Sequence, residues 1–286
     1  RNIEQSRPFR EQHMHQTIAF YLEGHYVYAV LTGFGDIKTV RYYASFLEQV
    51  LLDNIKRRKR DLGDDSERHE QFYTSLLRDA FATVEGEYRS SNNDKLSEKT
   101  VVGLKLQGNL PQNYPTINDR LKVLSLELSS GLSAVVALIV DQRLYVANIG
   151  DTKAIVCRKV LGDSGHDYIR SVKLSAQHDL NNAAEVHRLQ QLGLDTDLLR
   201  QKGEIGNMAL TRCLGNLWLK SFYQDFPDLA SAKQDPILAE PEVRTIVLDH
   251  TCLFLVLVSA SLPDALAEAT GKSDVTDDLV LMVHDH

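Results

Sequence analysis

The sequence predicts a layered α+β domain, and three observations support that fold class. Two long segments in the first third of the chain repeat apolar residues at helical spacing. From Gly131 onward the apolar residues form short, nearly continuous runs that are typical of buried strands. Two further apolar runs come late in the chain, after another helical segment. Helices, then antiparallel strands, then helices and strands again are the order of an α+β domain.

The N-terminal half begins with a strand and continues with helices. The strand covers Tyr26–Leu31 and stops near Gly33 and Gly35, which permit backbone conformations that other residues avoid. Helices are predicted over Asp36–Ile55 and Glu67–Tyr88. The polar residues 90–118 predict an insert or loop, and a short helix follows over Asn118–Leu128, with Leu121, Leu124 and Leu128 facing inward.

The C-terminal half begins with a tight hairpin. Only Asp141 and Gln142 separate the runs SAVVALIV and RLYVANI, which is the spacing of a two-residue turn. The runs KAIVCRKV and YIRSVKLS follow as strands. A helix is predicted over Ala183–Leu192, with Asp179 or Asn181 as its cap and Gly193 as its end. The last two apolar runs, Cys252–Ala260 and Asp278–His284, predict strands in the centre of a covered sheet.

Composition excludes several classes of protein. The chain has 286 residues and a net charge of -7, which argues against a nucleic-acid surface. No apolar run reaches the roughly 18 residues that a membrane span needs, and the first residues lack the shape of a signal peptide. The three cysteines, Cys157, Cys213 and Cys252, lie far apart. We interpret them as reduced thiols, which favours the cytoplasm.

Six segments form an ordered set of motifs: Ser130–Leu138 (SGLSAVVAL), Leu144–Ala154 (LYVANIGDTKA), Met208–Asn216 (MALTRCLGN), Pro241–Val243 (PEV), Val258–Leu266 (VSASLPDAL) and Thr276–Val280 (TDDLV). Their order and character resemble the metal-dependent 2C-type serine/threonine phosphatases, over nearly the whole chain. The resemblance implies a four-layer α/β/β/α sandwich, with two antiparallel sheets flanked by helices. It also implies one domain over residues 1–286, with a helical insert at about 90–130.

The resemblance further implies a site in which carboxylates hold Mg²⁺ or Mn²⁺ ions, and these ions activate a water for attack on phosphorus. Four matching positions lack the expected side chain. Thr32 replaces a metal-bridging aspartate, and Phe34 replaces a histidine of the same loop. Asn216 and Ala260 replace two further aspartates.

Two of the family's acids remain, Asp151 and Asp277, and we interpret both as vestigial carboxylates with structural roles. A hard cation needs several charged oxygen ligands. The sequence therefore predicts no bound metal, no other cofactor and no catalysis.

Three segments that lie largely outside these motifs, Leu110–Gly131, Arg188–Asp195 and Ser231–Val243, are similar to the phosphatase-like domain of adaptors that bind transforming-growth-factor-β-activated kinase. That resemblance implies a pseudophosphatase scaffold, a regulatory subunit of a MAP kinase kinase kinase complex in stress and innate-immune signalling. It implies two protein partners. One is the kinase, through a C-terminal tail that we expect this sequence to lack, and the other is a domain of an inhibitor-of-apoptosis protein.

Two alternatives remain open. An active Mg/Mn-dependent serine/threonine phosphatase would need acids from elsewhere, and Glu204 and Asp264 are the candidates that are near in sequence. A different metal site would use the histidines of His13–His15 or His284–His286. Only twelve residues separate Asp264 from Asp277, where the family has two helices, so we expect a segment near Gly271 to be missing.

Overall fold

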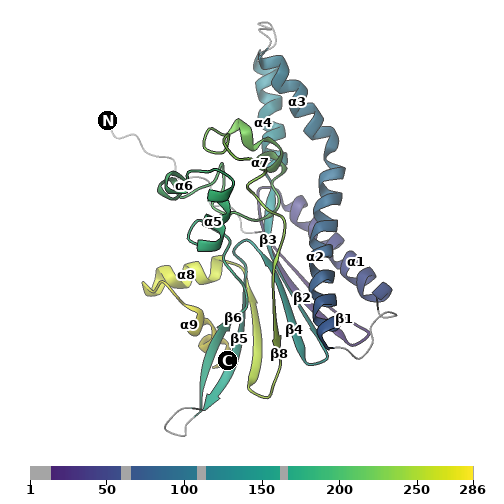
Figure 1. Ribbon diagram of the computed structural model, residues 1–286, viewed down its shortest axis with the longest axis vertical. Helices are drawn as coiled ribbons and strands as arrows, with labels where there is room; N and C mark the ends of the chain where they lie inside the picture. The colour runs from purple at the N-terminus through teal and green to yellow at the C-terminus, as the bar shows by residue number, and fades with distance from the viewer. Residues whose placement is uncertain (1–13, 59–65, 108–113, 162–166, 286) are drawn as a thin grey trace.

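The computed structural model describes residues 14–58, 66–107, 114–161 and 167–285, and its strands form two antiparallel sheets (Figure 1). The larger sheet has the order β1–β2–β3–β4–β8, and β7 pairs with β3. The smaller sheet has the order β6–β5–β9. The strands are β1 (Met14–Leu22), β2 (His25–Phe34), β3 (Gly131–Val140), β4 (Arg143–Ile149), β5 (Lys153–Leu161), β6 (Asp167–Lys173), β7 (Leu214–Gly215), β8 (Glu242–Val247) and β9 (Cys252–Val258).

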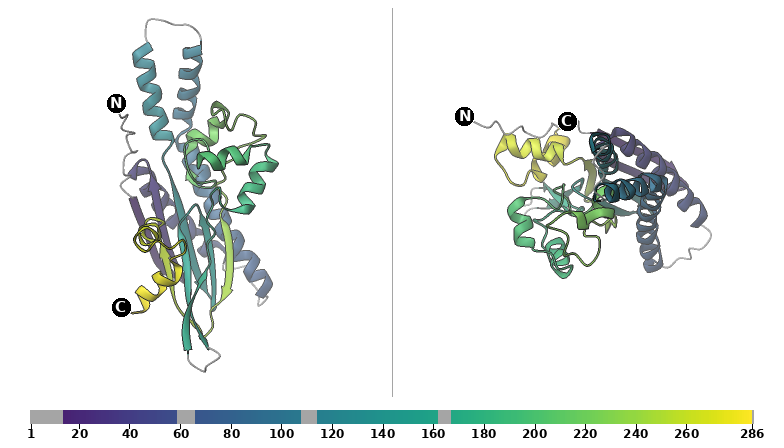
Figure 2. Two further views of the ribbon diagram at one scale, coloured as in Figure 1. Left: turned by 90° about the vertical axis from the view of Figure 1, so that its left-hand side faces the viewer. Right: turned by 90° about the horizontal axis from the view of Figure 1, so that it is seen from above.

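The two sheets pack face to face, and helices cover both outer faces (Figure 2). Buried side chains such as Val135, Val146 and Val156 fill the space between the sheets. The outer face of the larger sheet is covered by α1 (Ile37–Arg58) and α2 (Ser66–Ser91), and that of the smaller sheet by α8 (Ser261–Thr270) and α9 (Thr276–His284). The predicted α/β/β/α sandwich is confirmed.

The two long helices were placed correctly by their apolar spacing. Val40, Leu47 and Leu51 of α1 and Leu76 and Ala80 of α2 are buried against the larger sheet. Each observed helix extends a few residues beyond the predicted range. The stripe of apolar residues is thus the feature that fixes each helix on the sheet.

A helical hairpin projects beyond one end of the sheets (Figures 1 and 2). It consists of α3 (Asn93–Gln107) and α4 (Tyr114–Leu128). Of the two alternatives predicted for residues 90–118, an insert or a loop, the loop is therefore wrong, because nearly all of the described residues there are helical. A helix on the surface needs few apolar residues, so polar composition does not exclude one. Leu124 and Leu128 are buried as predicted, whereas Leu121 is partly exposed.

The predicted turn between β3 and β4 is confirmed. Asp141 and Gln142 have φ values of 48° and 59°, so both lie in the left-handed region that a tight hairpin of this type requires. The flanking strands pair in register from Val140 with Arg143 to Ala134 with Ile149.

Two predictions for the C-terminal part are wrong. The segment Asp278–His284 belongs to the helix α9 and is not a strand. Asp274 accepts a hydrogen bond from the Thr276 amide at 3.1 Å where this helix begins, and the helix buries Leu279 and Val280 against the smaller sheet. A short apolar run fits either state by its pattern.

The second error concerns β9, which was expected in the centre of a sheet. In the part of the chain that the structure describes, β9 lies at an edge of the smaller sheet, and most of its residues are partly exposed.

A separate apolar cluster lies at the end of the sandwich from which the hairpin projects. It includes α5 (Ala183–Gln191), α6 (Thr196–Lys202) and the residues around α7 (Leu217–Phe222). Asn182 caps α5, because its side chain accepts a hydrogen bond from the Ala184 amide at 3.0 Å, so Asp179 and Asn181 were the wrong residues. Gly193 ends this helix as predicted, with a φ of 91°.

Candidate functional site

The motif residues converge on a pocket of about 550 Å³ at this same end of the sandwich. Its lining includes three of the six predicted site residues, Phe34, Asp151 and Asn216. They come from the end of β2, the turn after β4 and the residue after β7. Segments that are far apart in sequence therefore meet in one place, as the resemblance implies.

Two glycines make this meeting of segments possible. Gly35 has a φ of 88°, and a Cβ there would lie 2.5 Å from the Ser130 hydroxyl oxygen. Gly150 has a φ of 82°, and a Cβ there would lie 2.0 Å from the Ser133 hydroxyl oxygen. Both turns need a residue without a side chain. The glycines thus form the frame of the pocket, whatever chemistry the pocket performs.

Asp151 is one of the carboxylates that line the pocket. Its amide donates a hydrogen bond to the Ser133 hydroxyl at 3.3 Å, which fixes the turn. Burial raises the pKa of Asp151, and the negative charge of Asp264 acts in the same direction, while the Ser133 hydroxyl opposes it.

Asn216 lines the pocket, and its side chain also caps a helix. It has a φ of 48° and caps α7, because its side-chain oxygen accepts a hydrogen bond from the Leu219 amide at 3.3 Å. Its side-chain nitrogen lies 3.2 Å from the sulfur of Met208. Phe34 and Met208 both pack against the apolar cluster of α5, α6 and α7. An amide and a phenyl ring therefore occupy two positions where the resemblance implies polar catalytic groups.

Thr32 and Ala260 lie close to the pocket without lining it. Thr32 pairs with Ser133 across the sheet, and its hydroxyl lies 3.3 Å from Nδ1 of His15. Ala260 is buried at the start of α8, two residues after Val258, which pairs with Lys153. Neither position offers a carboxylate.

Asp277 bonds to β6 and does not line the pocket. Its carboxylate accepts hydrogen bonds from the amide and the hydroxyl of Ser171 on β6, where it holds the first turn of α9 to the sheet. Because α9 is a helix, this acid does not join the other motif residues in the pocket.

The described side chains do not fit a two-metal centre. Across the described ranges, no group of three or more His, Cys, Asp or Glu side chains could hold a metal ion. Glu204, which was proposed as an alternative acid from its position in the sequence alone, lines the pocket together with Asp151. His15 contacts Thr32, and His284 contacts Asp285 at 3.3 Å, while His13 and His286 fall outside the described residues.

His178 is a residue of the site that the motifs did not single out for a role. It is fully buried, and its Nδ1 accepts a hydrogen bond from the Gly150 amide at 3.1 Å. Its own amide donates to the Gly150 carbonyl at 3.0 Å. Burial lowers the pKa of His178 to about 4, and Arg212 adds to this effect. A neutral imidazole thus locks the turn that carries Asp151.

A buried ion pair between Lys220 and Glu85 lies next to β7, and it was not predicted from the sequence. Lys220 Nζ lies 2.6 Å from Glu85 Oε1, and their side chains are 3% and 13% exposed. Glu85 also accepts hydrogen bonds from the Tyr43 hydroxyl at 2.7 Å and the Gly215 amide at 2.9 Å. The signal was present in the sequence, since Glu85 follows Phe81 by one helical turn on the apolar face of α2.

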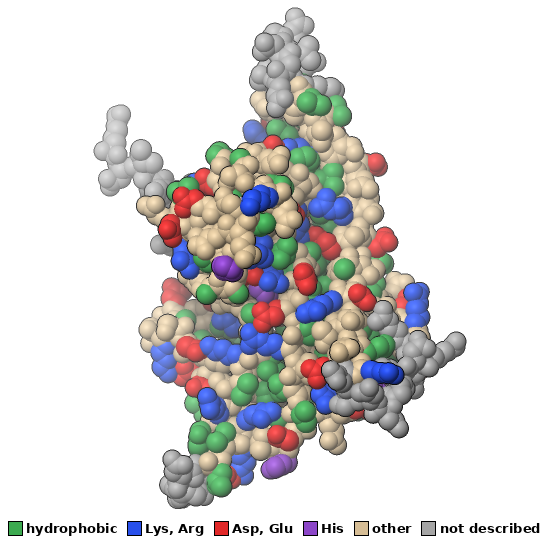
Figure 3. All heavy atoms as spheres, viewed as in Figure 1, with side chains coloured by type: hydrophobic (Ala, Val, Ile, Leu, Met, Phe, Trp, Pro, Cys, Tyr) green, Lys and Arg blue, Asp and Glu red, His purple; other side chains and the backbone are tan. Residues whose placement is uncertain are grey.

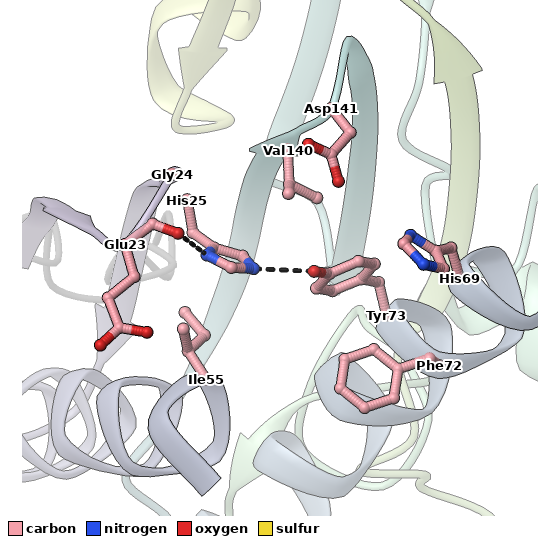
Figure 4. Close-up of a pocket in the computed structure, with 9 residues that line it drawn as sticks. All are labelled: Glu23, Gly24, His25, Ile55, His69, Phe72, Tyr73, Val140 and Asp141. Atoms are coloured by element: carbon pink, nitrogen blue, oxygen red, sulfur yellow. Dashed lines mark hydrogen bonds between the residues drawn. The ribbon is translucent and has the colours of Figure 1, made fainter. Parts of the chain in front are cut away.

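A second pocket, of about 240 Å³, lies between the tips of two hairpins and the ends of α1 and α2 (Figure 4). Figure 4 shows His25 between the backbone of Glu23 and the hydroxyl of Tyr73. His25 Nδ1 donates to the Leu22 and Glu23 carbonyls at 3.1 and 3.0 Å, so Nε2 accepts from the Tyr73 hydroxyl at 2.8 Å. Burial raises the pKa of Tyr73 to about 12. These contacts fasten the hairpin tips to the helices.

Acidic and basic side chains are interspersed over the face of the molecule seen in Figure 3. The three cysteines are free. Cys157 and Cys213 are buried, whereas Cys252 is only partly buried. None of the helices in the described part of the chain has the length and apolar character to cross a membrane.

Comparison with known proteins gives one family. The model of the family described as protein phosphatase 2C matches residues 58–280. Among curated proteins, "TGF-beta-activated kinase 1 and MAP3K7-binding protein 1" of Caenorhabditis elegans is 25% identical over 207 residues, which cover 72% of this chain and 47% of that protein. "Probable protein phosphatase 2C 13" of Arabidopsis thaliana is 29% identical over 153 residues, which cover 53% and 34%. The chain thus matches less than half the length of both relatives.

Solved structures share the fold. A Caenorhabditis elegans sex determining protein has a TM-score of 0.53 and 15% identity, over 87% of this chain and 48% of that one. The serine-threonine phosphatase 2C of Toxoplasma gondii has a TM-score of 0.53 and 12% identity, over 88% and 76%. At these identities the likeness concerns the fold alone.

Proposed function

Since its residues 58–280 match the family model, the chain belongs to the protein phosphatase 2C family, and we propose that it is a catalytically silent member that acts as a protein-binding scaffold. The observation that carries this proposal is the composition of the pocket. It gathers Phe34, Asp151 and Asn216, of which only Asp151 is an acid. Thr32 and Ala260 beside it offer no carboxylate, and Asp277 is bound to Ser171.

The small number of acidic side chains in the pocket supports the proposal that the chain is catalytically silent. A Mg²⁺ or Mn²⁺ ion binds through oxygen ligands, and carboxylates compensate the cost of removing its water. Asp151 and Glu204 are the acids that line this pocket.

The proposed partners have two different bases, the name of one relative and the sequence resemblance. One relative is named for binding a kinase of the MAP kinase kinase kinase class. We propose a place in such a kinase complex on the basis of that name. The proposed context of stress and innate-immune signalling, and a domain of an inhibitor-of-apoptosis protein as a second partner, rest on the sequence resemblance alone. The free cysteines support a cytoplasmic location.

A second candidate function is an active phosphatase with a divergent metal site. Two observations favour it: Glu204 lines the pocket, and the charge of Asp264 acts on Asp151. Relatives named as probable phosphatases also match this chain.

An assay with a small aryl phosphate and millimolar Mn²⁺ separates the two candidates. We expect no turnover above that of a heat-denatured sample. Turnover that Asp151→Asn abolishes, and that Asp167→Asn leaves unchanged, would establish the active phosphatase. Asp167 is a suitable control because it is an exposed acid at the start of β6.

Thermal unfolding gives a readout that does not depend on turnover. A ligand at a hundredfold excess over its Kd raises the free energy of unfolding by about 2.7 kcal/mol. We expect the same melting temperature in EDTA and in excess Mn²⁺. A rise of several degrees in Mn²⁺ that Asp151→Ala removes would reveal a working metal site.

Partner binding is tested by titrating the purified chain against the two partner classes in a calorimeter. A specific interface of this kind buries more than about 1,000 Å² in total. We expect saturable binding to an inhibitor-of-apoptosis domain. Failure of both the kinase and this domain to bind at micromolar concentration would remove the scaffold role.

A further inference from the structure

The smaller sheet ends in a strand whose second edge is open. β9 pairs with β5 on one side, from Lys153 with Val258 to Arg158 with Cys252. On its other side, no strand among the described residues pairs with it. The amide and carbonyl groups along that edge therefore face outward, where a further strand would bind them.

The larger sheet extends past this edge. Its inward-facing residues on β1 and β2, such as Ala19 and Tyr28, lie beyond the last strand of the smaller sheet and remain exposed. Together with Leu255 and Leu257 of β9 they form a groove of about 330 Å³. None of the residues that line this groove is charged.

The open edge lacks the features that normally prevent strand addition. Proteins protect exposed edges with charged residues, prolines or short strands. The seven residues of β9, CLFLVLV, include no charged residue and no proline. The opposite edge of the same sheet is different, since β6 carries Asp167, Arg170 and Lys173.

From these observations we propose that β9 is a docking edge for an extended segment of another protein, which adds to the smaller sheet as a further strand. The backbone of β9 supplies the hydrogen bonds, and the groove accepts every second side chain of the segment. The chemistry of the groove requires those side chains to be uncharged and apolar. Side chains on the opposite face of the added strand lie towards the layer of α8 and α9, which covers Phe254 and Val256.

A second copy of this chain does not fit the same place. If the β9 strand of a second copy paired with this edge, the second copy would also bring its β1 and β2 strands on one face and its α8–α9 layer on the other. One of these two parts would collide with the first copy. The proposed strand addition at β9 does not depend on catalytic inactivity. The aryl phosphate assay and the peptide-binding test therefore have independent outcomes.

The probe is a fluorescein-labelled, end-capped peptide of sequence KTVTVTVK. We expect a saturable rise in anisotropy with a Kd on the order of 10 to 100 µM. Two control peptides carry N-methyl groups, one on its valines and one on its threonines. Alternate residues of a strand point their amides to opposite sides, so we expect one control to bind at least about tenfold more weakly and the other to bind nearly as the parent does.

Two variants with the same substitution locate the site. Tyr28→Lys places a charge in the groove, whereas Tyr26→Lys changes an equally exposed tyrosine of the same strand that does not line it. We expect at least about a tenfold loss of peptide affinity for the first variant only. Both are checked for unaltered melting temperature, since both side chains are more than a third exposed.

Hydrogen exchange of the β9 amides gives a readout without any substitution. We expect alternate amides of Cys252–Val258 to exchange rapidly in the free protein and slowly with the peptide. Equal effects of the two N-methylated peptides or of the two tyrosine variants would overturn the proposal. So would protection of the whole strand before peptide is added, which would mean that the chain itself or a second copy already covers the edge.

Discussion

At the scale of single residues, the buried charge of Lys220 has the largest predictable effect. Burial alone would lower the pKa of Lys220, but the Glu85 carboxylate outweighs burial and raises it, so the pair stays ionised. Removal of one partner leaves the other charge buried without compensation, which costs about 3–5 kcal/mol. We expect Lys220→Met to lower the free energy of unfolding by this amount in denaturant titrations.

Two controls define that result. Lys122→Met, which removes a lysine whose side chain is 76% exposed, should change stability by less than about 0.5 kcal/mol. The double variant Lys220→Met, Glu85→Gln should recover part of the loss, because it buries no unpaired charge. A single variant as stable as the Lys122→Met protein would show that the pair contributes nothing.

His178 makes stability depend on pH. Its pKa falls from an ordinary value of 6.5 to about 4 on folding, so between these values the unfolded chain binds a proton that the folded chain does not. Stability from this residue is therefore complete above pH 6.5 and decreases as the pH falls towards 4. At pH 5 the loss is about 2 kcal/mol.

The measurement compares the free energy of unfolding at pH 7 and pH 5 in the parent and in His178→Gln. The difference between the two proteins isolates His178 from Asp235, whose pKa burial raises to about 6 and which therefore acts in the opposite direction. The same pH dependence in both proteins would contradict the assignment.

At the scale of elements, one lysine attaches the helical hairpin to the body of the domain. Lys99 of α3 lies 3.6 Å from the centre of the Phe222 ring and 4.8 Å from that of Trp218, and it pairs with Asp225. A cation over aromatic faces contributes about 1–2 kcal/mol when it is desolvated. We expect Lys99→Met to loosen the hairpin and to shift the fluorescence of Trp218, the single tryptophan of the chain.

The matched control is Lys95→Met on the same helix, because Lys95 forms an ion pair with Glu127 while its side chain remains 41% exposed. That variant should keep the parent's fluorescence. Identical spectra for the two variants would mean that Lys99 does not anchor α3.

Some elements were predictable from sequence because their patterns are local. The helical spacing of α1 and α2 and the two-residue turn at Asp141 depend only on neighbours in the chain. By contrast, β1 mixes polar and apolar residues, and α6, with seven residues, is too short to show a helical period. The helix α9 could not be predicted, because its apolar run fits a strand equally well and tertiary contacts at Leu279 decide the outcome.

Some features of the candidate site were likewise predictable from the sequence, and others were not. Motif order placed Phe34, Asp151 and Asn216 in one pocket. The position of Asp277 was not predictable, since it depends on the state of α9. Nor was the role of His178, because nothing in the neighbouring sequence indicates that it contacts Gly150.

At the scale of the whole molecule, the two sheets differ in protection. Residues 131–138 of β3 and 144–149 of β4 are buried, whereas most of β9 is partly exposed. Local opening is easiest where few apolar contacts are lost. We expect native-state hydrogen exchange to be fastest in β9 and α9 and slowest in β3 and β4. Uniform protection across both sheets would show that the sandwich opens only as a unit.

The strand order of the larger sheet also determines how long β2 waits for its partner strand β3 during synthesis. Phe34 at the end of β2 pairs with Gly131 at the start of β3, so 131 − 34 = 97 positions of chain must be added before the partner exists. A ribosome that adds about 5–20 residues per second needs roughly 5–20 s for this. During that interval α1 and α2 can form, but their apolar faces have only the β1–β2 hairpin to cover them. The nascent chain therefore exposes apolar surface during this interval, and the layer between the sheets can close only after the later strands have been made.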